Sequence, residues 1–175
     1  IVVYTGHLYP WKGADVLAKA AGLLSEEVLV YLVGGTAEDI KKFRKKYHFS
    51  NLKIVGWRPP SEIPFWLKAA DVLVLPNQAS EKISSHYTSP LKLFEYMASG
   101  VPIVASNLPS IREILDEKNA VLFLAGDIKE LEKAVSFVLQ NKDISDRISY
   151  QSCLDSKQYN WLERAKKIWN LVNKK

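Results

Sequence analysis

The chain has 175 residues, of which 47% are hydrophobic and 25% charged, and this is the composition of an ordinary globular domain. Disordered and collagen-like chains are therefore excluded. The 24 basic residues outnumber the 19 acidic ones, and the net charge of +5 suits a charged ligand such as a phosphate. Because the basic residues are spread along the sequence, this charge does not support a nucleic-acid partner, and we expect none.

Cysteine, histidine and long apolar runs are sparse. A single cysteine, Cys153, excludes an intramolecular disulfide and fits a reducing compartment, so we expect a cytoplasmic location, or the cytoplasmic face of a membrane. The three histidines lie far from one another, and no metal site is expected. No apolar run approaches the ~20 residues that span a bilayer. The chain opens on a strand-like run without a starting Met, from which we expect a fragment of a longer protein.

Six short apolar runs recur along the chain, nearly continuous and rich in β-branched residues. They are Ile1–Tyr4, Val28–Val33, Leu52–Val55, Val72–Leu75, Ile103–Ala105 and Val121–Leu124. Strands buried on both faces, as in parallel sheets, have this pattern. Amphipathic stretches with helical spacing lie between several of them, for example around 16–24, 40–47 and 131–139. The alternation predicts an α/β fold with a Rossmann-like, doubly wound parallel sheet of about six strands.

The tail from Asp143 to Lys175 has no strand pattern and is predicted to form two C-terminal helices. The second has an apolar face that contains two tryptophans, Trp161 and Trp169. This face is too apolar to stand in water, so we expect the helix to pack on the body of the protein, to be displaced from it, or to form a dimer. No repeat or long linker divides the sequence. We therefore predict a single domain over residues 1–175.

Ligands of open α/β sheets bind beyond the carboxyl ends of the strands, so the residues after each strand are the candidates. Gly6 follows the first run and allows a close backbone approach, and Lys12 is expected at the start of the next helix, where an anion is favoured. A simple turn with one solvated lysine is the alternative. The dinucleotide-binding and Walker glycine patterns are both absent, which argues against NAD dehydrogenases and P-loop NTPases.

Two further turns carry glycines and aromatic or cationic side chains. Gly34 begins a Gly-Gly-Thr turn after the second run, which allows either a close approach to a ligand or only a tight turn. After the third run, Trp57 and Arg58 follow Gly56 and offer stacking surfaces for a ring such as a nucleobase. A proline-stiffened loop with one half-exposed tryptophan is the alternative.

A polar stretch from 77 to 88 precedes a predicted helix that begins at Ser89 and ends at Gly100. Glu95 is unusual on this otherwise apolar helix. It either pairs with Lys92 on the surface or lies toward the helix N-terminus, where its carboxylate could accept both hydroxyls of a ribose.

Together these stretches resemble the nucleotide-sugar-binding C-terminal domain of GT-B glycosyltransferases, in the large retaining family called group 1. The resemblance spans essentially the whole chain, and the block from 89 to 106 is its most specific part. The segments that carry it are Tyr4–Gly13, Leu32–Gly35, Ile54–Trp57, Ala70–Pro76, Ser89–Ser106 and Asn160–Leu162.

The resemblance implies a role for each matching residue. The donor diphosphate would be bound by Gly6, His7, Lys12, Gly34, Ser89, Leu91 and Lys92, the ribose by Glu95, and the base by Gly56, Trp57 and Arg58. Tyr87 and Thr88 would lie near the donor sugar. The family usually has an arginine where this chain has His7, and often a glutamate where it has Tyr87. These departures put the identity of the donor sugar in doubt, and the catalytic residues stay unassigned.

The function expected from the resemblance is that of the donor-binding half of a retaining glycosyltransferase. It would use a UDP- or GDP-linked sugar, no cofactor and no metal, while an N-terminal domain absent from this chain binds a glycan or lipid acceptor. The full-length enzyme could associate peripherally with a membrane. A GT-B sugar-nucleotide epimerase and a phosphorylase share this architecture, although no pyridoxal lysine environment is found. A non-catalytic module with a decayed donor site is a further alternative.

Overall fold

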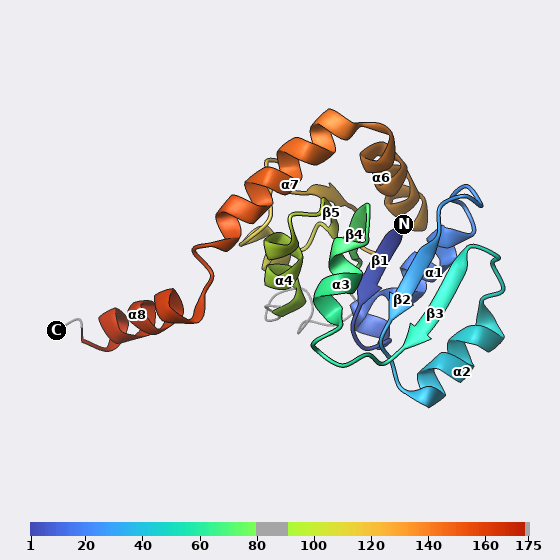
Figure 1. Cartoon of the computed structure of the whole chain (residues 1–175), viewed down its shortest axis with the longest axis horizontal. Helices are drawn as coiled ribbons and strands as arrows, with labels where there is room; N and C mark the ends of the chain where they lie inside the picture. The colour runs from blue at the N-terminus through green and yellow to red at the C-terminus, as the bar shows by residue number, and fades with distance from the viewer. Residues whose placement is uncertain (80–90, 174–175) are drawn as a thin grey trace.

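The computed structural model describes residues 1–79 and 91–173. Within these ranges the chain forms one parallel sheet with the strand order β3-β2-β1-β4-β5-β6 (Figure 1). The strands are β1 (Val2–Thr5), β2 (Val30–Val33), β3 (Leu52–Gly56), β4 (Val72–Leu75), β5 (Ile103–Ser106) and β6 (Val121–Phe123). Each coincides with a predicted apolar run to within two residues, so the expected six-stranded parallel sheet is confirmed.

The helices cover both faces of this sheet. They are η1 (Pro10–Lys12), α1 (Ala14–Ala21), α2 (Ala37–Lys46), α3 (Ile63–Lys68), α4 (Leu91–Ser99), α5 (Pro109–Arg112), α6 (Ile128–Gln140), α7 (Lys142–Ser156) and α8 (Trp161–Val172). Successive side chains of β1 point to opposite faces: Val2 and Tyr4 pack with α1 and α6, and Val3 packs with α3, α4 and α5. Burial on both sides explains why the strand sequences are continuously apolar.

The last two helices differ in how they meet the body. α7 packs along α4 and buries Ile148, Ser149 and Ser152. α8 then projects away from the sheet (Figure 1) and buries none of its residues. Trp161 is 77% exposed and Trp169 70% exposed. The two predicted C-terminal helices are therefore present, and of the arrangements expected for the second, packing on the chain's own body is wrong, because α8 is displaced from it. No helix in the described parts of the chain is long and apolar enough to cross a membrane.

Candidate functional site

A cleft of about 600 Å³ opens at the carboxyl ends of the central strands, beside the first turns of α4. The strand order reverses here, since β1 lies between β2 and β4, and such switch points are where open α/β sheets bind ligands. Nine predicted site residues line this cleft: Gly6, His7, Lys12, Gly34, Trp57, Arg58, Leu91, Lys92 and Glu95. Three others, Tyr87, Thr88 and Ser89, lie outside the described residues.

The floor of the cleft is bare backbone. The N–H of Gly6 donates to the carbonyl of Val33 at 2.8 Å, which ties the ends of β1 and β2 together. Gly34 has a φ of 127°, and a Cβ added there would come within 2.2 Å of the Gly6 carbonyl oxygen. The two loops therefore touch only because Gly34 carries no side chain, whereas a Cβ at Gly6 would meet only ordinary contacts, the closest at 3.5 Å from the Tyr4 hydroxyl. This arrangement leaves room for a ligand to lie directly on the main chain.

Gly56 has a supporting position. Its carbonyl accepts the N–H of Gly34 at 2.7 Å, and Gly56 is not among the residues that line the cleft. The structure thus places it one step behind the floor, while the residue that follows it, Trp57, reaches the cleft itself.

Lys12 enters the cleft from the loop after β1. It ends η1, one residue before Gly13, the N-cap of α1, and so lies at the start of that helix, where it was expected. Its Nζ lies 5.1 Å from the ring centre of Trp11 and 5.5 Å from that of Tyr9. Partial burial lowers the pKa of Lys12. A desolvated ammonium group of this kind gains from a nearby anion.

Lys92 enters from the opposite side, on the first turn of α4. Its Nζ donates to the carbonyl of Thr5 at 3.2 Å and lies 3.9 Å from the ring centre of Tyr4. Burial, and then the Lys12 cation, hold the pKa of Lys92 well below its usual range, whereas Glu95 raises it. Because Lys92 bonds inward to β1, the alternative of a surface pair with Glu95 is wrong. The two lysines line the same cleft, and the Lys12 cation disfavours the charged form of Lys92.

A buried tyrosine fixes the end of β1 between these lysines. The Oη of Tyr96, on α4, accepts the backbone N–H of Thr5 at 2.8 Å and the Thr5 hydroxyl at 3.2 Å. Burial raises the pKa of Tyr96 to about 12, so the group is a neutral phenol at physiological pH. On β1 itself, Tyr4 Oη donates to the carbonyl of His7 at 2.6 Å. These bonds hold the turn that contains Gly6 in one position.

The mouth of the cleft is aromatic and cationic. The ring of His7 stacks on that of Tyr9, with centres 5.0 Å apart and an interplanar angle of 6°. Trp57 is 67% exposed, and Arg58 donates through Nη1 to the Trp57 carbonyl at 3.1 Å. The same guanidinium lies 3.7 Å from the carboxylate of Glu62. Exposed rings and a held guanidinium offer stacking surfaces to a planar ligand.

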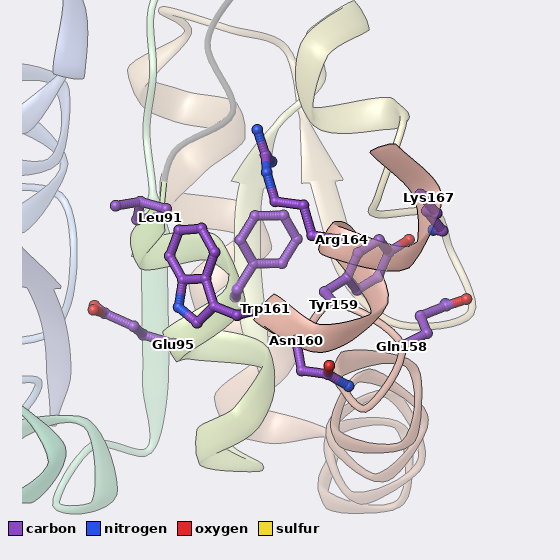
Figure 2. Close-up of a pocket in the computed structure, with 9 residues that line it drawn as sticks. Leu91, Glu95, Gln158, Tyr159, Asn160, Trp161, Arg164 and Lys167 are labelled. Atoms are coloured by element: carbon purple, nitrogen blue, oxygen red, sulfur yellow. The ribbon is translucent and has the colours of Figure 1, made fainter. Parts of the chain in front are cut away.

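Glu95 lies one turn into α4, exposed at the side of the cleft. It also borders a second cavity of about 350 Å³, between α4 and the start of α8, lined by Tyr159, Trp161 and Arg164 among others. Figure 2 shows the Glu95 carboxylate pointing away from Tyr159. No hydrogen bond or ion pair joins it to a described residue. Its oxygens are thus available to a ligand.

Residues that the sequence analysis did not select also line the cleft: Thr5, Trp11, Val33, Gly35, Pro60, Ile63 and Asn77. Most of them adjoin a selected residue and could have been found from their position at a strand end. Asn77 had its own signal, because it is the first polar residue after the fourth apolar run.

The comparisons with known proteins decide the family. The model of the family "Glycosyl transferases group 1" matches residues 1–141. The chain belongs to this family. The resemblance predicted from the sequence motifs is therefore confirmed, although the comparisons do not test the roles of individual residues.

Curated relatives of this group 1 chain are named as glycosyltransferases, and solved structures share its fold. It is 26% identical to an uncharacterized glycosyltransferase of Haemophilus influenzae, covering 96% of the chain and 47% of the relative. It is 28% identical to the UDP-Gal:alpha-D-GlcNAc-diphosphoundecaprenol alpha-1,3-galactosyltransferase of Escherichia coli, covering 98% and 44%. The crystal structure of Anabaena HepE in complex with UDP and glucose superposes with a TM-score of 0.82 at 20% identity, covering 99% and 48%. The chain thus spans about half the length of these relatives.

Proposed function

We propose that this chain is the donor-binding half of a retaining glycosyltransferase. It takes a UDP- or GDP-linked sugar and transfers it, without a metal ion or cofactor, to an acceptor held by a second domain outside these 175 residues. The observation that carries the proposal is the convergence of Lys12, Lys92 and Glu95 on one cleft with a floor of bare backbone.

The diphosphate would occupy the space between the two lysines. Gly6 and Gly34 let it lie on the main chain, and the free N–H groups at the start of α4, near Leu91, favour negative charge. In sugar transfer the nucleoside diphosphate departs with added charge. Two ammonium groups and a helix N-terminus stabilise that charge without a metal. Binding a diphosphate also removes the repulsion between Lys12 and Lys92.

The rest of the nucleotide fits the remaining wall. Glu95 lies one helical turn beyond Leu91, so its carboxylate is the acceptor for the two ribose hydroxyls. The base would lie toward Trp57 and Arg58 at the mouth of the cleft. The sugar end of the donor then points away from this rim, toward the deepest part of the cleft.

The relatives support the donor class and the stereochemistry. The HepE structure contains UDP and glucose, and the E. coli relative is named for a UDP-linked donor and an alpha-linked product. An alpha-linked product is the outcome of a retaining enzyme that acts on an alpha-linked nucleotide sugar. That relative's acceptor is a lipid diphosphate, so we propose a glycan or lipid acceptor for the full-length enzyme, acting in the cytoplasm or at the cytoplasmic face of a membrane.

Calorimetric titration of the chain with UDP and GDP tests the proposal. Weak binding of one of the two is expected, and no transfer of sugar, because the acceptor half is missing. Lys12→Met should weaken binding about tenfold or more, because a charge-assisted contact to phosphate is lost. Lys129→Met removes the same charge from an exposed position outside the cleft and should change nothing. No binding of either nucleotide at millimolar concentration would refute the proposal.

A further inference from the structure

Asn77 is a buried residue in the wall of the cleft. It follows β4 by two residues, and β4 is the strand paired with β1 at the switch point. The backbone beside it is fixed, because the N–H of Gln78 donates to the carbonyl of Trp11 at 2.9 Å. This bond ties the end of β4 to the loop that carries Lys12. Asn77 therefore lines the same cleft as Lys12 and Lys92, next to the backbone bond that joins the two loops.

The side chain of Asn77 is buried without being satisfied. The residue is only 2% exposed, yet it forms part of the cleft wall. Its Oδ1 has no solvent exposure and accepts no hydrogen bond from any described residue. A buried acceptor without a partner is unfavourable, and such atoms are rare in native proteins. Within the described residues Oδ1 therefore has no donor, and because Asn77 lines the cleft, a ligand can supply one.

The missing partner of Asn77 Oδ1 must be a hydrogen-bond donor, and this restricts which part of a ligand it can be. Oδ1 is an acceptor, and the oxygens of a diphosphate are also acceptors at neutral pH, so a diphosphate alone cannot satisfy it. The nearest cation in the loop, Lys12, lies over the rings of Tyr9 and Trp11 instead. A sugar hydroxyl can donate to Oδ1, and it can also accept from the amide nitrogen.

We infer that Asn77 recognises the donor sugar, by presenting its carboxamide to a hydroxyl group of the sugar at the inner end of the cleft. The inference rests on the proposed function, since it requires a nucleotide sugar in this cleft. Because Oδ1 is buried in the free chain, a rotation of the side chain would be needed to present it to the ligand. This hydrogen bond strengthens the binding of the sugar conjugate and not that of the bare nucleotide. Asn77 is thus a specificity-determining residue for the sugar.

The test compares a nucleotide with its sugar conjugates in two variants. UDP, UDP-glucose, UDP-galactose, UDP-N-acetylglucosamine, GDP and GDP-mannose are titrated into the parent chain, Asn77→Ala and Gln78→Ala. Gln78 is the matched control, because its amide already bonds Asp15 at 3.0 Å and does not line the cleft. For at least one sugar, Asn77→Ala should weaken binding of the conjugate about tenfold relative to the bare nucleotide. Gln78→Ala should leave that ratio unchanged.

The outcomes separate the inference from the proposed function. If the parent binds no nucleotide at all, the proposed function fails, and the inference fails with it. If Asn77→Ala weakens the nucleotide and all its conjugates equally, the carboxamide binds the diphosphate, and the inference alone is wrong. If Asn77→Ala leaves the affinity of every sugar conjugate relative to its bare nucleotide unchanged, Asn77 does not contact the sugar, and the inference is wrong. Thermal unfolding of each variant provides the folding control, because Asn77→Ala removes the amide nitrogen together with the unpartnered oxygen.

Discussion

Replacing Glu95 with alanine should separate ligand binding from stability more cleanly than any other substitution in the cleft. Its carboxylate is exposed and joined to no described residue, so Glu95→Ala should change the free energy of unfolding by at most ~0.5 kcal/mol. Two hydroxyls on a charged acceptor contribute about 1.5–3 kcal/mol each when well formed. Because the cleft is open to water, we expect a total loss of roughly 2 kcal/mol, or about 30-fold in the Kd for UDP or GDP.

Glu95 has a second effect that the assay must remove. Its charge raises the pKa of Lys92, so alanine also reduces the positive charge that faces the diphosphate. A double-mutant cycle isolates the ribose contact. Calorimetry compares the parent and Glu95→Ala with the nucleoside diphosphate and its 2′,3′-dideoxy analogue. The variant should bind both ligands equally, and the parent should prefer the natural one. Glu113→Ala, an exposed glutamate outside the cleft, is the control. If the parent binds both ligands equally, Glu95 is not a ribose ligand.

Three other perturbations test the surrounding structure. The pKa of Lys92 is depressed in the folded state, so between that lowered value and about 10.5 the unfolded chain holds more protons, and stability should rise with pH. Urea unfolding should show this rise, and Lys92→Met should reduce it to the smaller part that comes from Lys12, whose pKa is also lowered. Affinity for the diphosphate should fall over the same interval as Lys92 loses its charge. Gly34→Ala forces a Cβ against the Gly6 carbonyl at a positive φ and should cost about 3 kcal/mol in the same assay; an unchanged midpoint would contradict the close approach. Truncation after Asn160 removes α8 but keeps the Phe94–Tyr159 ring contact, so the melting temperature should stay the same, and a large decrease would show that α8 docks.

The strands could be predicted because burial on both faces requires consecutive apolar residues, and these are visible in the sequence of each strand alone. Every residue of β1, β4 and β5 is buried, and an unbroken apolar run is visible without any partner. Parallel strands also end at one edge of the sheet, so Gly6, Gly34 and Trp57 could be placed near one another. The short helices α3 and α5 were not predicted, because six and four residues are too few to show a helical period.

Contacts between segments far apart in the chain cannot be predicted in this way, because the sequence of one segment does not show which other segment packs against it. The spacing of Lys92 and Glu95 allowed a surface pair, and only the fold shows Lys92 over the ring of Tyr4. In the same way, the apolar face of α8 indicates that something should cover it but does not show what does. The unpartnered oxygen of Asn77 is invisible in a sequence, because its isolation depends on every neighbour that the fold brings near.

The position of β1 in the middle of the sheet has a consequence for the order of folding. Its first neighbour, β2, is close in sequence, but the Thr5 bonds to α4 join residues 87 and 91 positions apart. Pairings of such separation close large loops and tend to form late. The cleft therefore comes into existence only when the second half of the chain has packed on the first. A nucleotide that binds there should slow unfolding while leaving the folding rate almost untouched, and it would act as a chemical reporter that the polypeptide has completed its folding.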